Sequence, residues 1–118
     1  MNCKEYIQSI EKSPISTLKI KSVENRYTEI KSKLVMQIVS CAEETNFFDD
    51  DIRSLSFNEI IEAENDLHVD FKSKGLLPLF DCGENDFIVY HLCDNSWSKF
   101  NITDEIIFNK RPSLMELL

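Results

Sequence analysis

The chain has 118 residues, a length that suits one domain. Its 13 Lys and Arg and 21 Asp and Glu give a formal net charge of −8, and its 42% hydrophobic residues are enough for a globular core. The acidic balance argues against nucleic acid as a direct partner, because proteins bind phosphate mainly through Lys and Arg. Two glycines are too few for the glycine-rich motifs that bind nucleotide phosphates.

The N-terminal residues do not resemble a signal peptide, since no apolar stretch follows Lys4. The longest uncharged apolar run covers residues 34–42, whereas a membrane-spanning helix needs roughly 20 residues. The four cysteines form no CxxC pair, so neither a zinc knuckle nor a thioredoxin-type motif is supported. We therefore expect a cytoplasmic protein with free thiols and with no cofactor or metal.

Helices are predicted first along the chain. Apolar residues at helical spacing favour a helix over residues 1–12, which ends before Pro14. A second helix is predicted over residues 23–30, with Ser22 as its N-cap. Residues 34–40 suit either a strand or a helix, because their β-branched side chains favour a strand while their flanks permit a helix.

The middle of the chain begins with an acidic loop at residues 43–51. After this loop, Ser56 and Glu59 form a capping-box pattern that opens a helix ending near Leu67. The apolar positions of this helix suit an amphipathic helix that lies on a sheet.

The last third of the chain alternates short apolar runs with turns. A turn is predicted at residues 81–86, and a second capping box at Ser113 opens a short helix. The strands are predicted over residues 75–80, 87–92, 97–102 and 106–108. Helices followed by a meander of strands indicate the α+β class. We expect a single domain in which N-terminal helices and a central helix pack on a mixed or antiparallel sheet, with a short C-terminal helix.

Charge is distributed unevenly along the chain. Residues 1–40 contain seven Lys and Arg and four Asp and Glu, whereas residues 41–70 contain one Arg and ten Asp and Glu. Such a field of carboxylates is not the pattern of a catalytic pair, which needs one carboxylate held in a distinctive environment. The field is either a solvated acidic surface or the complement of a basic partner.

Neither histidine belongs to a recognisable catalytic or metal-binding pattern. His91 with Cys82 and Cys93 supplies three potential metal ligands, but their spacing matches no standard motif. A strand-borne histidine on a polar face is the simpler interpretation, and no Ser-His-Asp or Cys-His arrangement is indicated. The same two cysteines are also candidates for facing each other across a hairpin.

Several segments resemble the SUKH (Smi/Knr-domain) superfamily. The run LPLFDCGENDFIVY at residues 77–90 resembles two strands of the family and the polar turn between them. The segments SVENRY at residues 22–27 and LSFNEI at residues 55–60 resemble its first helix and the step into its central helix. Trp97 and the closing SLMELL at residues 113–118 also fit, so the resemblance extends over residues 22–118 in order.

The resemblance implies a non-catalytic binding domain with helices packed on a mixed or antiparallel sheet. Bacterial SUKH proteins are commonly immunity proteins that neutralise a toxin by binding it, and nuclease toxins are frequent partners. We therefore expect a monomeric or weakly dimeric immunity protein, not an enzyme, that occludes the substrate site of a basic, nuclease-like toxin and contacts neither nucleic acid nor membrane. The alternatives are a scaffold or regulatory interaction domain and a small enzyme, which would need a deep pocket.

The candidate contact surface is the acidic strip at residues 43–66 together with aromatic anchors. Phe47 and Phe48 either anchor a partner or pack beneath the loop, and Trp97 is either an interface hot spot or a core aromatic. The predicted partner-binding residues are Glu43, Glu44, Phe47, Phe48, Asp49, Asp50, Asp51, Glu62, Asp66 and Trp97.

Overall fold

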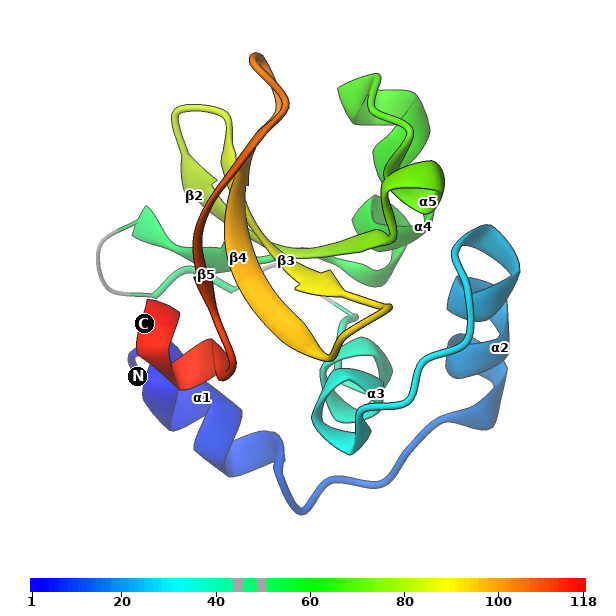
Figure 1. The fold of residues 1–118 in the computed structure, drawn as a ribbon. Helices are drawn as coiled ribbons and strands as arrows, with labels where there is room; N and C mark the ends of the chain where they lie inside the picture. Colours follow the sequence, from blue (N-terminus) through cyan, green and yellow to red (C-terminus); the bar gives the residue numbers. More distant parts are fainter. Residues whose placement is uncertain (44–45, 49–50) are drawn as a thin grey trace.

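Along the chain, helices come first and an antiparallel sheet follows, as Figure 1 shows. The structure is a computed structural model, and it describes residues 1–43, 46–48 and 51–118. The helices are α1 (Cys3–Ile10), α2 (Thr17–Arg26), α3 (Lys33–Ser40), α4 (Phe57–Leu67), α5 (Phe71–Lys74) and the 3-10 helix η2 (Leu114–Leu117). The strands are β1 (Arg53–Ser54), β2 (Leu76–Gly83), β3 (Asp86–His91), β4 (Ser96–Asn101) and β5 (Ile106–Arg111). They pair in the order β1-β2-β3-β4-β5, so the predicted α+β class is confirmed.

The second helix begins earlier than the sequence pattern predicts. The N-cap of α2 is Ser16, whose hydroxyl accepts a hydrogen bond from the Lys19 amide at 3.4 Å. Ser22, the predicted cap, lies inside the helix and donates its hydroxyl to the Leu18 carbonyl. The prediction was wrong because any Ser before an apolar residue matches the cap pattern, and several serines precede Val23. The ambiguous segment at residues 34–40 is helical and forms α3.

The central helix forms as predicted. In the capping box of α4, the Ser56 hydroxyl accepts from the Glu59 amide at 3.2 Å, and Glu59 Oε1 accepts from the Ser56 amide at 2.9 Å. Ile60 and Ala63 are the fully buried side chains of this helix. The helix ends at His68, which adopts a left-handed conformation with φ of 57°.

Three local predictions in the last third need correction. The short helix α5 was not predicted, and Gly75 ends it with φ of +68° instead of opening a strand. Ser113 caps η2 by accepting from the Met115 amide, so the second predicted capping box, which requires the Glu116 amide, is wrong. The turn at residues 81–86 is shorter than predicted, because β2 continues to Gly83.

Helices cover both faces of the sheet. Phe100 of β4 contacts the ring of Phe71 of α5, with ring centroids 5.8 Å apart. Its neighbour Lys99 points to the opposite face, because successive side chains on a strand alternate, and there it lines a hollow with Glu116 and Leu117 of η2. In Figure 1, α4 and α5 lie beside β2, while α1, α3 and η2 lie below the strands.

The register of the β2–β3 pair separates two cysteines. Leu76 pairs with His91 at one end of the hairpin, and Asp81 pairs with Phe87 near the turn. Cys82 therefore lies at the turn end and Cys93 at the open end. The two thiols, which were candidates for facing each other across the hairpin, therefore do not do so.

Long-range hydrogen bonds fix the position of α4, which borders the candidate site. The buried hydroxyl of Tyr27, at the end of α2, donates to the Ile60 carbonyl of α4 at 2.7 Å. Burial is the main cause that raises the pKa of Tyr27, so the phenol stays protonated and keeps donating. None of the described helices is both long and apolar enough to span a membrane.

Candidate functional site

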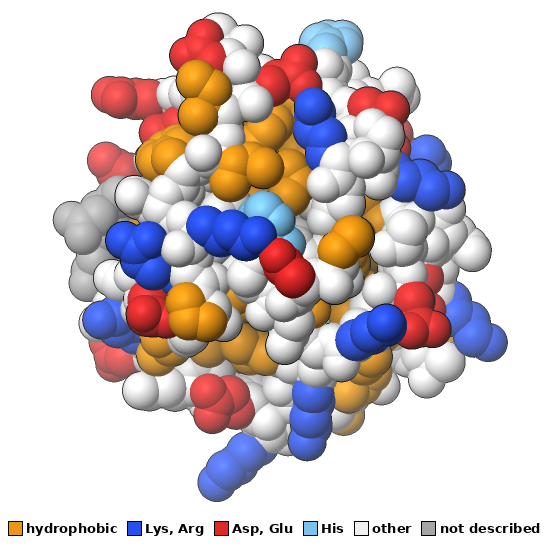
Figure 2. All heavy atoms as spheres, in the orientation of Figure 1, with side chains coloured by type: hydrophobic (Ala, Val, Ile, Leu, Met, Phe, Trp, Pro, Cys, Tyr) orange, Lys and Arg blue, Asp and Glu red, His pale blue; other side chains and the backbone are white. Residues whose placement is uncertain are grey.

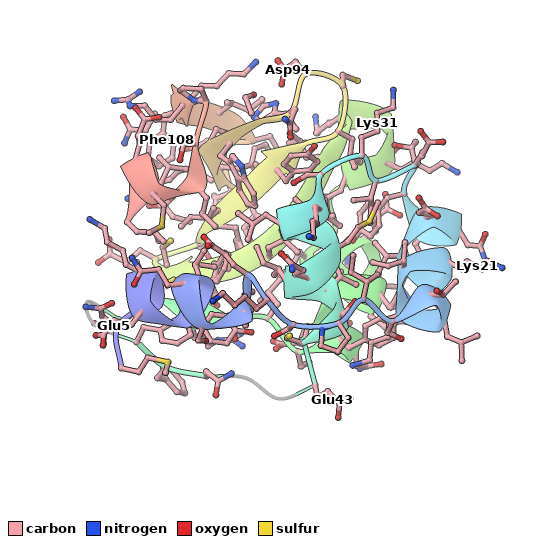
Figure 3. The ribbon with its side chains drawn as sticks, turned by 90° about the horizontal axis from the view of Figure 1, so that it is seen from below. Glu5, Lys21, Lys31, Glu43, Asp94 and Phe108 are labelled. Atoms are coloured by element: carbon pink, nitrogen blue, oxygen red, sulfur yellow. The ribbon has the colours of Figure 1, made fainter. Side chains whose placement is uncertain are left out.

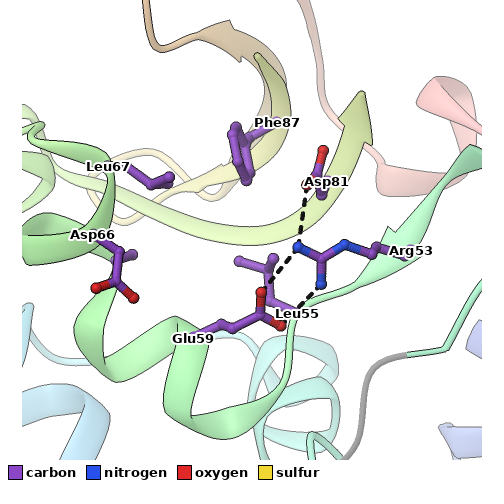
Figure 4. Close-up of a pocket in the computed structure, with 8 residues that line it drawn as sticks. Arg53, Leu55, Glu59, Asp66, Leu67, Asp81 and Phe87 are labelled. Atoms are coloured by element: carbon purple, nitrogen blue, oxygen red, sulfur yellow. Dashed lines mark hydrogen bonds and ion pairs between the residues drawn. The ribbon is translucent and has the colours of Figure 1, made fainter. Parts of the chain in front are cut away.

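A small pocket lies between α4 and the strands β1 to β3. Its volume is about 100 Å³. One side is apolar and the other contains carboxylates around a single arginine, as Figure 4 shows. The lining residues are Arg53, Leu55, Glu59, Ala63, Asp66, Leu67, Asp81 and Phe87.

Arg53 of β1 joins its own strand to α4 and β2, three of the four elements that form the pocket. Its Nη1 and Nη2 atoms donate to the two carboxylate oxygens of Glu59 on α4, each at 2.9 Å. Nη2 also donates to Asp81 Oδ2 on β2 at 3.2 Å. The hydrogen bond with Glu59 raises the pKa of Arg53, so the guanidinium remains charged. A bidentate pair of this kind fixes both position and orientation.

Glu59 is held from two directions. Its Oε1 accepts from the Ser56 amide within the capping box and also from Arg53. The capping-box glutamate of α4, which accepts from the Ser56 amide, therefore also accepts from the guanidinium. The local sequence signal for a helix start thus determines where this carboxylate lies in the pocket.

Asp66 lies across the pocket from Arg53 in Figure 4. It comes from the last turn of α4, and its side chain is exposed. Within the described part of the chain, its carboxylate has no hydrogen-bond or ion-pair partner. Among the described residues, the pocket lining therefore contains three carboxylates, from Glu59, Asp66 and Asp81, and one guanidinium.

Phe47 lies beside the pocket. It forms a β-bridge with Arg53, in which the Phe48 amide donates to the Ile52 carbonyl and the Ser54 amide donates to the Asn46 carbonyl. These hydrogen bonds join the residues on either side of Phe47 and Arg53, so Phe47 and Arg53 themselves are a non-hydrogen-bonded pair of the antiparallel ladder. The two side chains of such a pair lie close together on one face of the sheet. On its other side Arg53 pairs with Asp81, and this pair is a hydrogen-bonded one because the Leu55 amide donates to the Leu79 carbonyl two residues along. The Asp81 side chain therefore also lies on the face of the sheet that carries Arg53. The Phe47 ring is 74% exposed, so a large apolar side chain lies in solvent next to the pocket.

The other two predicted aromatic anchors are packed. Phe48 is half-buried, and its ring contacts that of Tyr6 with centroids 5.1 Å apart. Trp97 is 4% exposed and packs against Tyr90, so its indole belongs to the core and offers no surface to a partner. The sequence left both alternatives open for these residues, and the packing favours the core.

Two predicted acidic contacts are already paired within the chain. Glu43 forms an ion pair of 2.9 Å with Lys19, and this hydrogen bond lowers the pKa of Glu43. Glu62 lies 3.5 Å from Arg26. Both cations belong to α2, so the basic N-terminal region folds against the acidic middle segment. Figure 3 shows Glu43 at the edge of the molecule, pointing outward.

The remaining acids of the strip are only partly described. Asp51 is exposed and adopts a left-handed backbone conformation with φ of 62°. Glu44, Asp49 and Asp50 lie outside the described residues. In Figure 2, acidic and basic side chains are interspersed over the face in view, and hydrophobic side chains gather near its upper centre. The acidity of this face is therefore local and not continuous.

The histidine on the sheet has ordinary strand contacts. His91 Nε2 is 2.7 Å from the hydroxyl of the buried Ser98. The pKa of His91 is lowered, mainly by burial and to a smaller extent by the positive charge of Lys110. Within residues 1–43, 46–48 and 51–118, no group of His, Cys, Asp and Glu is arranged to hold a metal ion.

Sequence reasoning identified Phe47 and Asp66 of this site but missed its central residues. Arg53, Asp81, Leu67 and Phe87 come from four elements that only the fold brings together. One signal was available, since Arg53 is the single basic residue among the ten acids of residues 41–70. A lone cation in such a segment is expected to have carboxylate partners.

Comparison with known proteins finds no match to a family model, to a curated protein or to a solved structure. The resemblance to the SUKH superfamily therefore stays a prediction that rests on the quoted segments.

Proposed function

We propose that this chain is an immunity protein of the SUKH type, which binds a cognate toxin and occludes its substrate site without chemistry of its own. The expected toxin is basic and nuclease-like, because nuclease domains bind phosphate through Lys and Arg. The sequence segments that resemble SUKH proteins suggest the class of function. The observation that supports a binding role most directly is the exposed Phe47 beside a carboxylate-lined pocket.

This combination is typical of protein interfaces. An aromatic side chain supplies apolar area that is buried on binding, and surrounding charges steer the partner and set its orientation. The pocket volume of about 100 Å³ is well below the roughly 300–1,000 Å³ of most small-molecule sites. A protein partner fits these dimensions better than a metabolite does.

The first test uses the proposed toxin domain, which is sought among the products of the neighbouring genes. Association rates are measured at several salt concentrations for the wild type and for a variant with Asp49→Lys, Asp50→Lys and Asp51→Lys. Steering by the acidic strip predicts that association slows by about tenfold at low salt and that its salt dependence weakens. An unchanged rate with an unchanged salt dependence would refute the role of this strip.

A matched control reverses three exposed acids outside the strip, by Glu11→Lys, Glu84→Lys and Asp104→Lys. The net charge changes equally in both variants, so only a local effect distinguishes them. A second variant, Phe47→Ala, is expected to speed dissociation while leaving the association rate nearly unchanged.

A further inference from the structure

We propose that the pocket between α4 and β1 to β3 receives the side chain of one arginine from the basic partner. This inference rests on the proposed function, because it names the chemical group that the partner presents. The guanidinium would lie against Asp66, and its alkyl chain would lie on the apolar side of the pocket.

The net negative charge of the pocket lining favours the binding of a cation. Glu59 and Asp81 bind the guanidinium of Arg53, and Asp66 lies across the pocket from it. The described lining residues therefore have an excess of two negative charges. Arg53 is already shared between Glu59 and Asp81, whereas Asp66 has no ionic partner among the described residues. A second cation placed beside Asp66 reduces the mutual repulsion of the carboxylates.

The shape of the pocket suits a long amphipathic side chain. Leu55, Ala63, Leu67 and Phe87 form its apolar side, and they offer surface to methylene groups. A volume of about 100 Å³ holds several waters, which the end of one side chain would displace. Arginine and lysine both combine an apolar stem with a charged end.

The internal contacts of the pocket favour arginine over lysine. Arg53 shows that the carboxylates here accept a planar guanidinium in bidentate geometry, with two bonds of 2.9 Å to Glu59. A guanidinium also stacks on aromatic rings and is less strongly hydrated than an ammonium, so it loses less on entering a partly apolar pocket. Phe87 supplies such a ring in the pocket lining.

Phe47 adds a contact outside the pocket. Since its side chain lies next to that of Arg53 on the same face of the sheet, a partner arginine that enters the pocket brings its neighbouring residues onto the exposed ring. Burial of the ring would exclude water from the pocket mouth and strengthen the ionic contact inside.

The direct test is an NMR titration with N-acetyl-L-argininamide, with the neutral N-acetyl-L-citrullinamide as the matched probe. We expect saturable shifts of the amides of residues 66, 67 and 87, with a dissociation constant in the millimolar range (about −4 kcal/mol). The citrulline probe should bind at least about tenfold more weakly. Shifts that do not saturate, or that are equal for both probes, would overturn the proposal.

Two variants separate a local contact from a general charge effect. Asp66→Asn should weaken binding of the arginine probe about five- to tenfold, whereas Asp104→Asn, which removes the same charge from an exposed turn, should leave it unchanged. Both residues are exposed, so both variants are expected to fold. Equal weakening by the two variants would refute a specific role of Asp66.

The same variants distinguish this proposal from the proposed function. If the toxin binds the wild type and Asp66→Asn equally well, the immunity role stands and the arginine contact is wrong. If the arginine probe binds but no toxin does, the pocket chemistry stands and the immunity role is wrong.

Discussion

Tyr27 offers the sharpest test of how α2 and α4 are held together. Tyr27→Phe removes one hydroxyl whose only hydrogen bond within the described residues is the 2.7 Å bond to the Ile60 carbonyl, and it leaves the packing volume nearly unchanged. A buried hydrogen bond of this kind contributes about 1 kcal/mol of net stability. We therefore expect the variant to unfold at lower urea concentration at pH 7, with the free energy of unfolding reduced by about 1 kcal/mol.

Alkaline pH should remove this difference. Burial raises the pKa of Tyr27 in the folded state, whereas in the unfolded chain its pKa is about 10. Above that pH the unfolded wild type loses a proton that the folded state retains, so unfolding becomes easier by about 1.4 kcal/mol per pH unit. The phenylalanine variant lacks this titration. The free energies of unfolding of the variant and the wild type should therefore become equal between about pH 10 and pH 11.

The assay is urea denaturation followed by circular dichroism at pH 7, 9, 10 and 11 for both proteins. The difference between the two free energies isolates Tyr27, because Tyr6 and Tyr90, which also have raised pKa values, titrate in both chains. A difference that stays constant from pH 7 to 11 would refute the reasoning, and so would a difference below about 0.3 kcal/mol at pH 7.

Three further predictions concern the site and the sheet. Arg53→Met should lower the free energy of unfolding by about 1–2 kcal/mol, and a double-mutant cycle with Glu59→Gln should show a coupling energy near 1 kcal/mol; additive effects would contradict the pairing. In an NMR titration, the pKa of His91 should lie below the ordinary histidine value of 6.5, and a midpoint above 6.5 would contradict its environment. The unfolded chain then binds a proton at His91 more readily than the folded state does, so the free energy of unfolding should fall as the pH drops below about 6.5. With a thiol reagent at pH 8, exposed Cys93 should react in the native protein, whereas buried Cys3, whose pKa burial raises to about 12, should react only after unfolding, and fast native reaction of Cys3 would contradict its burial. Half-buried Cys82, whose pKa burial raises to about 11, should react more slowly than Cys93 in the native protein.

Local signals predicted the central helix and the four strands of the last third, whereas the short strand β1 was not predicted. The Ser56 and Glu59 capping box is formed by residues three apart, and the alternating strand residues 87–92 need only their neighbours to be recognised. Local signals failed where several residues fit one role. Ser16 and Ser22 both suit an N-cap, and the choice of Ser16 follows from tertiary contacts such as that of its amide with the Ser40 hydroxyl.

Charge is the property that sequence and structure describe most differently. The sequence determined that the acids concentrate in residues 41–70 and that the preceding forty residues are basic. It could not determine that Lys19 and Arg26 would pair with Glu43 and Glu62, because those pairs join residues that are distant in the chain.

By itself, the sequence determined the class of fold, the central helix, the meander of strands and the existence of an acidic segment. These depend on hydrophobic spacing, caps and turns, which act over a few residues. Only the tertiary structure decided which acids stay unpaired and which aromatics stay exposed. It placed Asp66 opposite Arg53, left Phe47 in solvent and buried Trp97, because pairing and burial depend on neighbours brought together by the antiparallel register and by the packing of α4 on β2.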